Sequence, residues 1–327
     1  MIRAGVLMLW MLVFSSAHAD NWKQVLDLRG QWLFAIGDNV KWSQPTYNDR
    51  EWEPIRVPAK WEDQGFSGYN GFAWYRKTFD GTRLQDKGLS YSLFLGYVDD
   101  VDEVYVNGHK IGSSGAFPPR YHTAYNAKRI YVIPSEYLSF TGKNVIAVRV
   151  YDAEIEGGIV NGDIGIYTNE DDKAFLVTLR GLWDFCPLYK RDGSMRNEKR
   201  TPPESARWTN INVPELWEHQ GFHYDGTAWY RKQFFVPANV DTDDLILILG
   251  KVDDYDQTYI NGKLVGSTAK HDHLRVYYLK PDVIVAGSMN LLLVYVDDPQ
   301  GLGGIYEGPV GIMKQSQFTR FMRYRDR

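Results

Sequence analysis

The chain has 327 residues, of which 44% are hydrophobic and 24% are charged, the ordinary composition of a folded globular protein. A net charge of −4 gives no reason to expect a nucleic acid as partner. Its one cysteine, Cys186, cannot form an internal disulfide, which excludes a disulfide-stabilised scaffold. We expect this side chain to be buried and to pack as a small hydrophobic residue.

The first segment has the pattern of an export signal. Arg3 precedes an apolar run over residues 4–14 that is short for a bilayer span, and Ala17-His18-Ala19 forms a small-residue cleavage site. We therefore expect residues 1–19 to be removed and the mature protein to be periplasmic or secreted. An uncleaved anchor is the alternative.

From residue 28 onward the sequence repeats itself. The markers LRG, W-x-F, VP, W-E-x-Q-G-F, AWYRK, VDD, N-G and GGI occur in the same order over residues 28–166 and 179–312. The offset stays between about 151 and 146 residues, far longer than the roughly 20–50 residues of a solenoid repeat. We therefore expect two similar domains, 20–170 and 173–315, joined by a short acidic linker.

Short alternating runs of apolar and polar residues predict strands throughout both halves. The clearest runs cover residues 74–79, 91–95, 145–150, 245–249 and 291–296. Asn107-Gly108 and Asn261-Gly262 predict two hairpins, because Asn-Gly tolerates the positive φ angles of a type I′ turn. We expect an all-β fold of two tandem jelly-roll β-sandwiches.

Aromatic residues make up 15% of the chain, and several recur at matching positions of the two halves. Such recurrence is typical of core packing, but Trp61 and Trp217 stand before glycine-rich segments that we interpret as loops. Loops on a rigid sheet often carry binding sites. The segments Trp61–Tyr69 and Trp217–Tyr224 are therefore candidate platforms for a sugar ring.

Each half carries an acidic cluster shortly after a Leu-Gly pair. The first half has Asp99, Asp100 and Asp102, and the second has Asp253, Asp254 and Asp256. Three interpretations are open. The carboxylates pair with arginines of their own half, namely Arg76 or Arg129 and Arg231 or Arg275. Alternatively, Asp99, Asp100, Asp253 and Asp254 accept hydrogen bonds from sugar hydroxyls while Arg129 and Arg275 donate others. In the third interpretation Asp99, Asp100 and Asp102 bind calcium.

The two halves differ most in one loop. Residues 113–128 of the first half read SSGAFPPRYHTAYNAK, whereas residues 267–274 of the second read STAKHDHL. Phe117, Arg120 and Tyr121 offer stacking and hydrogen bonding to a glycan. The alternative is a lid that covers the second domain.

These markers also carry a resemblance over nearly all of the mature chain. The string VDD-x-D-x-x-Y-x-N-G, followed by R-x-Y, VRVYD and GGI, resembles the galactose-binding-like domain of sialate O-acetylesterases. The AWYRK-x-F strand and the VP…W segment before it resemble the sugar-binding domain of family 2 glycoside hydrolases, such as β-galactosidases and β-glucuronidases. The resemblance implies an accessory domain, since catalysis there belongs to a separate domain, and it implies calcium as a candidate ligand.

No catalytic motif stands out, since neither a G-x-S-x-G elbow nor a zinc-binding spacing of His or Cys is present. We predict no catalytic residues and no cofactor, apart from calcium as a candidate. The expected function is glycan binding, accessory to a catalytic glycan-degrading partner. Two alternatives are a hydrolase with its site between the two domains and a module that docks onto a catalytic subunit.

Residues 316–327 interleave aromatic residues with arginines after the second repeat is complete. We expect a disordered or loosely packed tail there. Attachment to an anionic membrane surface is the alternative, and membrane contact through the tail is not expected.

Overall fold

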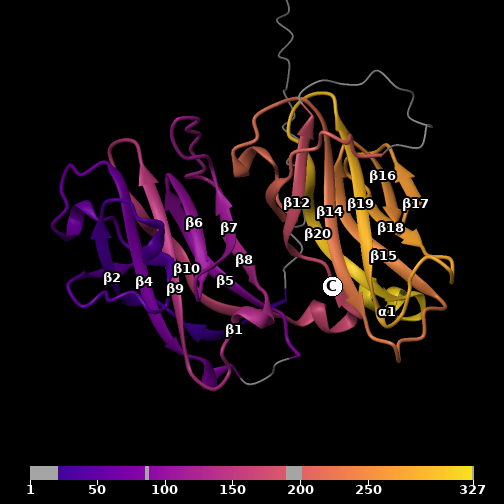
Figure 1. The fold of residues 1–327 in the computed structure, drawn as a ribbon, viewed down its shortest axis with the longest axis horizontal. Coiled ribbons are helices and arrows are strands. Elements are labelled where there is room, and N and C mark those ends of the chain that lie inside the picture. The colour runs from indigo at the N-terminus through magenta and orange to yellow at the C-terminus, as the bar shows by residue number, and fades with distance from the viewer. Residues whose placement is uncertain (1–20, 85–87, 189–200, 326–327) are drawn as a thin grey trace, which may run out of the picture.

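The computed structural model describes residues 21–84, 88–188 and 201–325, which form an almost entirely β structure (Figure 1). The predicted signal peptide, residues 1–19, lies outside the described residues. Within the described part, no helix is long and apolar enough to cross a membrane. In these described ranges, six short 3-10 helices connect strands: η1 (Val40–Ser43), η2 (Glu62–Gln64), η3 (Gly81–Arg83), η4 (Ser135–Tyr137), η5 (Glu170–Ala174) and η6 (Glu218–Gln220).

The first ten strands, which we call the first repeat, form two antiparallel sheets. They are β1 (Trp22–Asp27), β2 (Gly30–Ile36), β3 (Glu53–Val57), β4 (Gly71–Asp80), β5 (Tyr91–Asp99), β6 (Val101–Val106), β7 (His109–Ser114), β8 (Arg129–Ile133), β9 (Lys143–Asp152) and β10 (Gly158–Asn169). A six-stranded sheet has the order β3-β2-β4-β9-β6-β7 and a four-stranded sheet the order β1-β10-β5-β8.

The next ten strands, the second repeat, copy this arrangement. They are β11 (Val177–Thr178), β12 (Gly181–Leu188), β13 (Thr209–Val213), β14 (Gly226–Val236), β15 (Leu245–Asp253), β16 (Tyr255–Ile260), β17 (Lys263–Thr268), β18 (Leu274–Tyr278), β19 (Ser288–Asp298) and β20 (Gly304–Lys314). Their sheets have the orders β13-β12-β14-β19-β16-β17 and β11-β20-β15-β18. The same element order in both halves places equivalent loops at equivalent edges.

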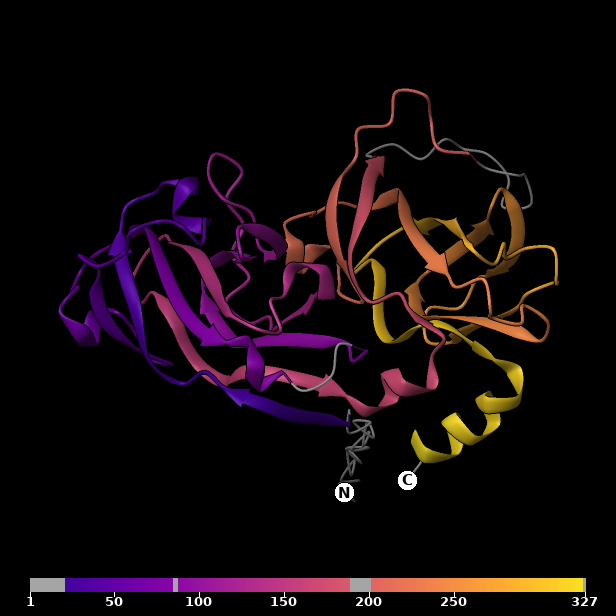
Figure 2. The ribbon, with the colours of Figure 1, turned by 60° about the horizontal axis from the view of Figure 1, so that its bottom comes forward.

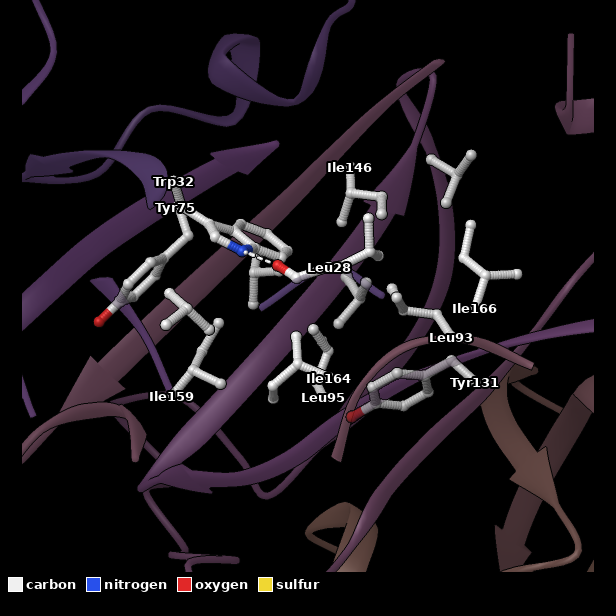
Figure 3. Packing of buried hydrophobic residues seen from close by; sticks show 14 of the residues in the cluster. Leu28, Trp32, Tyr75, Leu93, Leu95, Tyr131, Ile146, Ile159, Ile164 and Ile166 are labelled. Atoms are coloured by element: carbon white, nitrogen blue, oxygen red, sulfur yellow. Dashed lines mark hydrogen bonds between the residues drawn. The ribbon is translucent and has the colours of Figure 1, made fainter. Parts of the chain in front are cut away.

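Each repeat buries one hydrophobic core that draws on both of its sheets. In the first repeat, Trp32 and Tyr75 of the six-stranded sheet belong to one cluster with Leu93 and Ile164 of the four-stranded sheet (Figure 3). The indole N–H of Trp32 donates to the carbonyl of Leu28 at 2.8 Å, so the buried polar group is satisfied. An equivalent cluster fills the second repeat.

The predicted fold class was right about the all-β content and wrong about two tandem jelly-roll β-sandwiches. A jelly roll has about eight strands in two sheets. Here each repeat has ten described strands, six in one sheet and four in the other. The W-x-F strand and the strand after it are the reason, because β2 and β3, like β12 and β13, extend one sheet of each repeat.

The predicted local elements are confirmed. The five predicted runs lie within β4, β5, β9, β15 and β19, and the two Asn-Gly pairs connect β6 to β7 and β16 to β17. Asn107 and Gly108 have φ angles of 50° and 84°, and Asn261 and Gly262 have 49° and 77°, as a type I′ turn requires. Cys186 is buried on β12, as expected.

The long loop of residues 113–128 touches the second repeat. The backbone N–H of Gly115 donates to the carbonyl of His219 at 2.8 Å, and the rings of His122 and His223 stack with centroids 4.1 Å apart. Strands β7 and β8 lie beside β12 (Figure 1). The loop therefore bridges the repeats, in agreement with its interpretation as a cover for the second domain.

The C-terminal segment forms helix α1 (Gln315–Arg325), which packs on the four-stranded sheet of the second repeat (Figure 2). Phe321 is 6% exposed and contacts the buried cluster that contains Ile246 and Ile248. The prediction of a disordered or loosely packed tail over 316–327 was wrong for residues 316–325, the part of it that the structure describes. Its aromatic residues recur at helical spacing, which lets one face of the helix bury against the sheet.

Candidate functional site

Three aspartates of the first repeat converge at one edge of its sheets. Asp99 ends β5, Asp100 follows it, and Asp152 ends β9. Oxygen atoms of the three carboxylates lie within 4.8 Å of one another, which defines the acidic cluster. Asp100 and Asp152 are buried and Asp99 is half-buried. Because like charges at this distance repel, the site requires hydrogen-bond donors, retained protons or a cation.

Asp100 receives the donors. One of its oxygens accepts from the hydroxyl of Thr123 at 2.5 Å, and the other accepts from the backbone N–H of Ala153 at 3.0 Å. The hydroxyl of Tyr121 is a third donor. Burial alone would raise the pKa of Asp100, but these donors together hold that pKa below its ordinary value. Asp100 is therefore ionised at neutral pH.

Asp99 and Asp152 are in the opposite situation. Burial raises the pKa of each to about 7, and the neighbouring charge of Asp100 adds to both shifts. Asp152 accepts one backbone hydrogen bond, from Glu154 at 3.1 Å, which only partly offsets its burial. Near neutral pH, the charge of the cluster thus responds to any ligand that brings a donor or a cation.

A row of four aromatic side chains leads away from the acidic cluster. The rings of Tyr121 and Tyr151 meet edge-on with centroids 5.6 Å apart, and Phe72 lies 4.8 Å beyond Tyr151. Phe117 stacks on Phe72 at 5.8 Å, beneath the guanidinium of Arg149. All four rings are half-buried, so each keeps part of its surface in solvent. This aromatic row joins apolar ring surface to hydrogen-bonding carboxylates.

The second repeat keeps the carboxylates. Asp253 and Asp254 lie with His271 within 4.8 Å of one another. Asp298 occupies the position equivalent to Asp152, and among the described residues one of its buried carboxylate oxygens has no hydrogen-bond partner. Burial raises the pKa of Asp253 to about 7 and that of Asp298 to about 6.

The aromatic row does not recur in the second repeat. The residue before AWYRK is Phe72 in the first repeat and Thr227 in the second. Residues 148–152 and 294–298 share the pattern V-x-V-x-D, and within it Asp297 stands where the first repeat has Tyr151. Phe117 and Tyr121 lie on the segment 113–128, which has sixteen residues. The equivalent segment of the second repeat, 267–274, has eight. The two edges therefore share charge but not stacking surface.

The third acidic position of each repeat belongs to the core. Asp102 pairs with Arg129 at 2.7 Å and Asp256 pairs with Arg275 at 2.9 Å, with all four side chains 0% exposed. The interpretation of pairing within each repeat is confirmed for these two aspartates. The predictions of Asp102 as a calcium ligand and of Arg129 and Arg275 as sugar ligands were wrong, because the partners satisfy each other away from solvent.

Trp61 and Trp217 are not sugar platforms. Both are 0% exposed and belong to the two main cores. Tyr69 and Tyr224 pack on them with ring centroids 5.9 and 4.8 Å away, and their hydroxyls donate to backbone carbonyls three residues on. The prediction of exposed stacking surfaces was wrong, because the glycine-rich segments fold back over the tryptophans.

The structure brings together four of the predicted binding residues: Asp99, Asp100, Phe117 and Tyr121. Arg120 is exposed on the same loop. Three residues of the site were missed: Phe72, Tyr151 and Asp152. The last had a signal, because an aspartate ends the V-x-V-x-D marker in both repeats. The two aromatic residues had none, because the second repeat does not share them.

The oxygen atoms of the acidic cluster suit a hard cation. Calcium prefers carboxylate oxygens at about 2.3–2.6 Å, so oxygens that share one ion lie within about 5 Å of each other. Those of Asp99, Asp100 and Asp152 meet this condition. The orphaned carboxylate oxygen of Asp298 gives the second repeat a similar opening. The residues present therefore fit calcium, with Asp152 in the role predicted for Asp102.

Comparisons with known proteins relate this chain to β-galactosidases and β-glucuronidases. Residues 37–155 match the family model described as the β-galactosidase second all-β domain. β-Galactosidase BoGH2A of Bacteroides ovatus is 29% identical over 167 residues, which cover 47% of this chain and 18% of that protein. A solved β-glucuronidase of Bacteroides uniformis aligns at 16% identity with a TM-score of 0.37, over 88% of this chain and 28% of that one.

The matched segment contains the whole acidic cluster and the whole aromatic row. The chain itself covers only 18% of the length of the Bacteroides ovatus relative. The resemblance to sialate O-acetylesterases stays a prediction. The first repeat thus contains a domain like the all-β sugar-binding domains of family 2 glycoside hydrolases, and the chain is a relative of these carbohydrate-active proteins.

Proposed function

We propose that the chain is an exported carbohydrate-binding protein that assists glycan degradation without cleaving the glycan itself. The observation that supports this most is that the acidic cluster and the aromatic row meet inside the segment that matches a β-galactosidase domain. Export to the periplasm or the medium is proposed on the pattern of residues 1–19.

The edge of the first repeat offers both kinds of contact that a sugar needs. Tyr121 and Tyr151 present half-buried rings against which the C–H face of a sugar can pack. Asp100 accepts hydrogen bonds from hydroxyls beside them, and Thr123 and Ala153 fix its orientation before any sugar arrives. Because sugar hydroxyls give up bonds to water, the net gain is small, and we expect Kd in about the millimolar range.

Calcium is the proposed additional ligand of this edge. When bound, the ion supplies positive charge that cancels the repulsion among the three carboxylates and attracts sugar hydroxyls. Asp99 and Asp152 hold protons near neutral pH and would release them as the ion binds, so calcium affinity should rise with pH.

A hydrolase is the second candidate function. The observation that favours it is the divergence of two neighbouring pKa values, raised to about 7 at Asp99 and lowered at Asp100, a pattern that acid–base pairs show. Against it, the three carboxylates converge on one point. In retaining glycosidases two carboxyl groups face each other across the scissile bond at about 5–5.5 Å. A shared ligand or cation accounts for the convergence more directly.

The glycan and the partner are proposed from the relatives. A β-galactosidase and a putative β-glucuronidase are among the relatives that match this chain in sequence, so galactosides and glucuronides are the first glycans to test. A catalytic glycan-degrading protein is the proposed partner. A module that only docks onto such a partner would bind no glycan by itself.

The test is a glycan titration of the mature full chain, followed by NMR at the Ala153 amide, which donates to Asp100. We expect a saturable shift with a galactoside and a Kd at least tenfold weaker in Tyr121→Ala. Tyr125→Ala is the matched control, because Tyr125 is 58% exposed on the same loop. It should leave the Kd unchanged.

Chromogenic glycosides and acetyl esters are tested in parallel. Turnover that Asp99→Asn abolishes would establish the hydrolase and contradict the proposed role. No shift with any glycan, together with binding to a catalytic partner, would leave the docking module as the function.

A further inference from the structure

A cavity lies between the two repeats, away from the acidic cluster. It has a volume of about 800 Å³ and is bordered by β5 and β8 on one side and by β12, β13, β15 and β20 on the other. Its lining includes Trp22, Tyr97, Arg180, Asn212, Lys251 and Tyr306. Its volume is that of a small-ligand site. None of the residues of the acidic cluster or of the aromatic row lines it.

The two walls of this inter-repeat cavity are held against each other. Besides the contacts of the long loop, the guanidinium of Arg180, the residue before β12, lies 4.6 Å from the ring centre of Trp22 in β1, across the boundary. The side-chain amide of Asn212 approaches the carbonyl of Ser113 at 3.4 Å. The cavity therefore has a defined shape that exists only because the repeats are paired.

The charges of the lining balance each other. Three basic side chains each face an acid that also lines the cavity: Lys251 with Glu307 at 2.9 Å, His219 with Glu215 at 2.8 Å, and Arg180 with Asp172 at 3.7 Å. The other two charged side chains on the lining, Lys128 and Asp171, have opposite signs. A charged ligand would have to break such pairs, so the lining favours an uncharged one.

Each wall of the cavity carries a half-buried tyrosine. Tyr97 comes from β5 of the first repeat and Tyr306 from β20 of the second. Their phenol rings add aromatic surface on which the C–H face of a sugar can pack. Sugar hydroxyls both donate and accept hydrogen bonds, so they match the paired polar side chains of the lining without adding a charge.

We propose that the inter-repeat cavity is a second glycan site, which takes an uncharged oligosaccharide in preference to a uronic acid. This rests on the proposed carbohydrate-binding function but not on the edge of the first repeat, since the two sites share no residue. Pairing the repeats then creates a site that neither repeat contains alone.

The test is an NMR titration of the full mature chain with lactose and with a β-glucuronide, read at three amides. Gly181 and Gly308 line the cavity and Ala153 reports the edge of the first repeat. We expect lactose to shift all three amides saturably. In Asp100→Asn the shifts of Gly181 and Gly308 should persist with an unchanged Kd while that of Ala153 is lost.

Variants of the cavity walls complete the test. Tyr97→Ala and Tyr306→Ala should each weaken lactose binding at the cavity amides at least tenfold and leave Ala153 unaffected. The second variant keeps the test valid if the first fails to fold. Shifts at Ala153 alone would overturn the cavity site and leave the proposed function standing. No shift at any amide would overturn both, and a glucuronide that binds the cavity more tightly than lactose would overturn the preference for an uncharged sugar.

Discussion

The acidic edges of the two repeats start from the same aspartate positions and end in different environments. Asp100 is held by the hydroxyl of Thr123 and the N–H of Ala153. Pro299 stands at the equivalent of Ala153 and has no N–H to donate, and the shorter loop of the second repeat has no counterpart of Thr123. Asp254 thus lacks both donors that orient Asp100. Only the first edge is preorganised for a ligand.

This difference separates what the scaffold requires from what a site requires. The buried pair Asp102–Arg129 recurs as Asp256–Arg275 with nearly the same distance, because each core must satisfy a buried charge. The aromatic row does not recur, because its rings come from a loop and from strand positions at the rim. Repetition within this chain marks the core and the carboxylates of both edges, whereas the aromatic part of the site occurs in the first repeat alone.

The largest expected effect tests whether the two cores depend equally on their arginine. Arg129→Met leaves Asp102 buried without its charged partner and should lower the free energy of unfolding by about 3–5 kcal/mol in urea titrations. Arg275→Met should cost a similar amount through Asp256. The double change Arg129→Met with Asp102→Leu should recover part of the loss. A single arginine variant with the wild-type midpoint would contradict the account of the core.

The next largest effect on stability is expected at helix α1, on the four-stranded sheet of the second repeat. Helix α1 covers the second repeat, so Phe321→Ala should destabilise that repeat by about 3 kcal/mol. Arg323→Ala is the matched control, because Arg323 is exposed on the same helix and should change little. Thermal unfolding followed by circular dichroism measures both. Equal melting temperatures for Phe321→Ala and the wild type would show that the helix does not contribute to the fold.

The sequence predicted the two repeats and the strands in which apolar and polar residues alternate. Strand runs, both Asn-Gly hairpins and the buried cysteine followed from local pattern, because turn chemistry and side-chain period are local properties. Trp61 was misjudged because a glycine-rich neighbour resembles a loop whether it opens to solvent or folds over the ring. Asp152 and Tyr151 are about fifty residues from Asp100 in the sequence, and only the pairing of β9 with β6 brings them beside it. The domains 20–170 and 173–315 remain a proposal, with α1 assigned to the second.

Calcium should distinguish the two edges. A concentration near a hundred times Kd stabilises a protein by about 2.7 kcal/mol, so we expect a higher Tm on adding Ca²⁺ to chelator-treated protein. Asp152→Asn should remove most of this gain, because Asp152 belongs to the converging cluster. Asp298→Asn is the matched change in the second repeat. A gain that disappears only in Asp298→Asn would place the ion at the second edge.

The smallest expected effect concerns pH. Burial raises the pKa of Glu218 to about 7, while the backbone N–H of Gly303 donates to it at 3.1 Å. An acid with a higher pKa in the folded state stabilises it below the unfolded pKa and loses that stabilisation as pH rises through the folded value. The free energy of unfolding should therefore fall by about 2 kcal/mol between about pH 4.5 and 7 on account of Glu218.

Glu218→Gln should remove this contribution, and urea titrations at several pH values of both proteins measure it. Parallel curves for the variant and the wild type across that range would show that Glu218 does not titrate in the folded state as described.

The central claim is that the edge of the first repeat binds sugar and the equivalent edge of the second does not. One lactose titration of the wild-type protein compares them directly, read at the Ala153 amide beside Asp100 and at the Gln300 amide, which donates to Asp298 at 3.1 Å. We predict a saturable shift at Ala153 and none at Gln300. A shift at Gln300 with none at Ala153 would contradict the claim, and equal shifts at both would show that the aromatic row does not decide where the sugar binds.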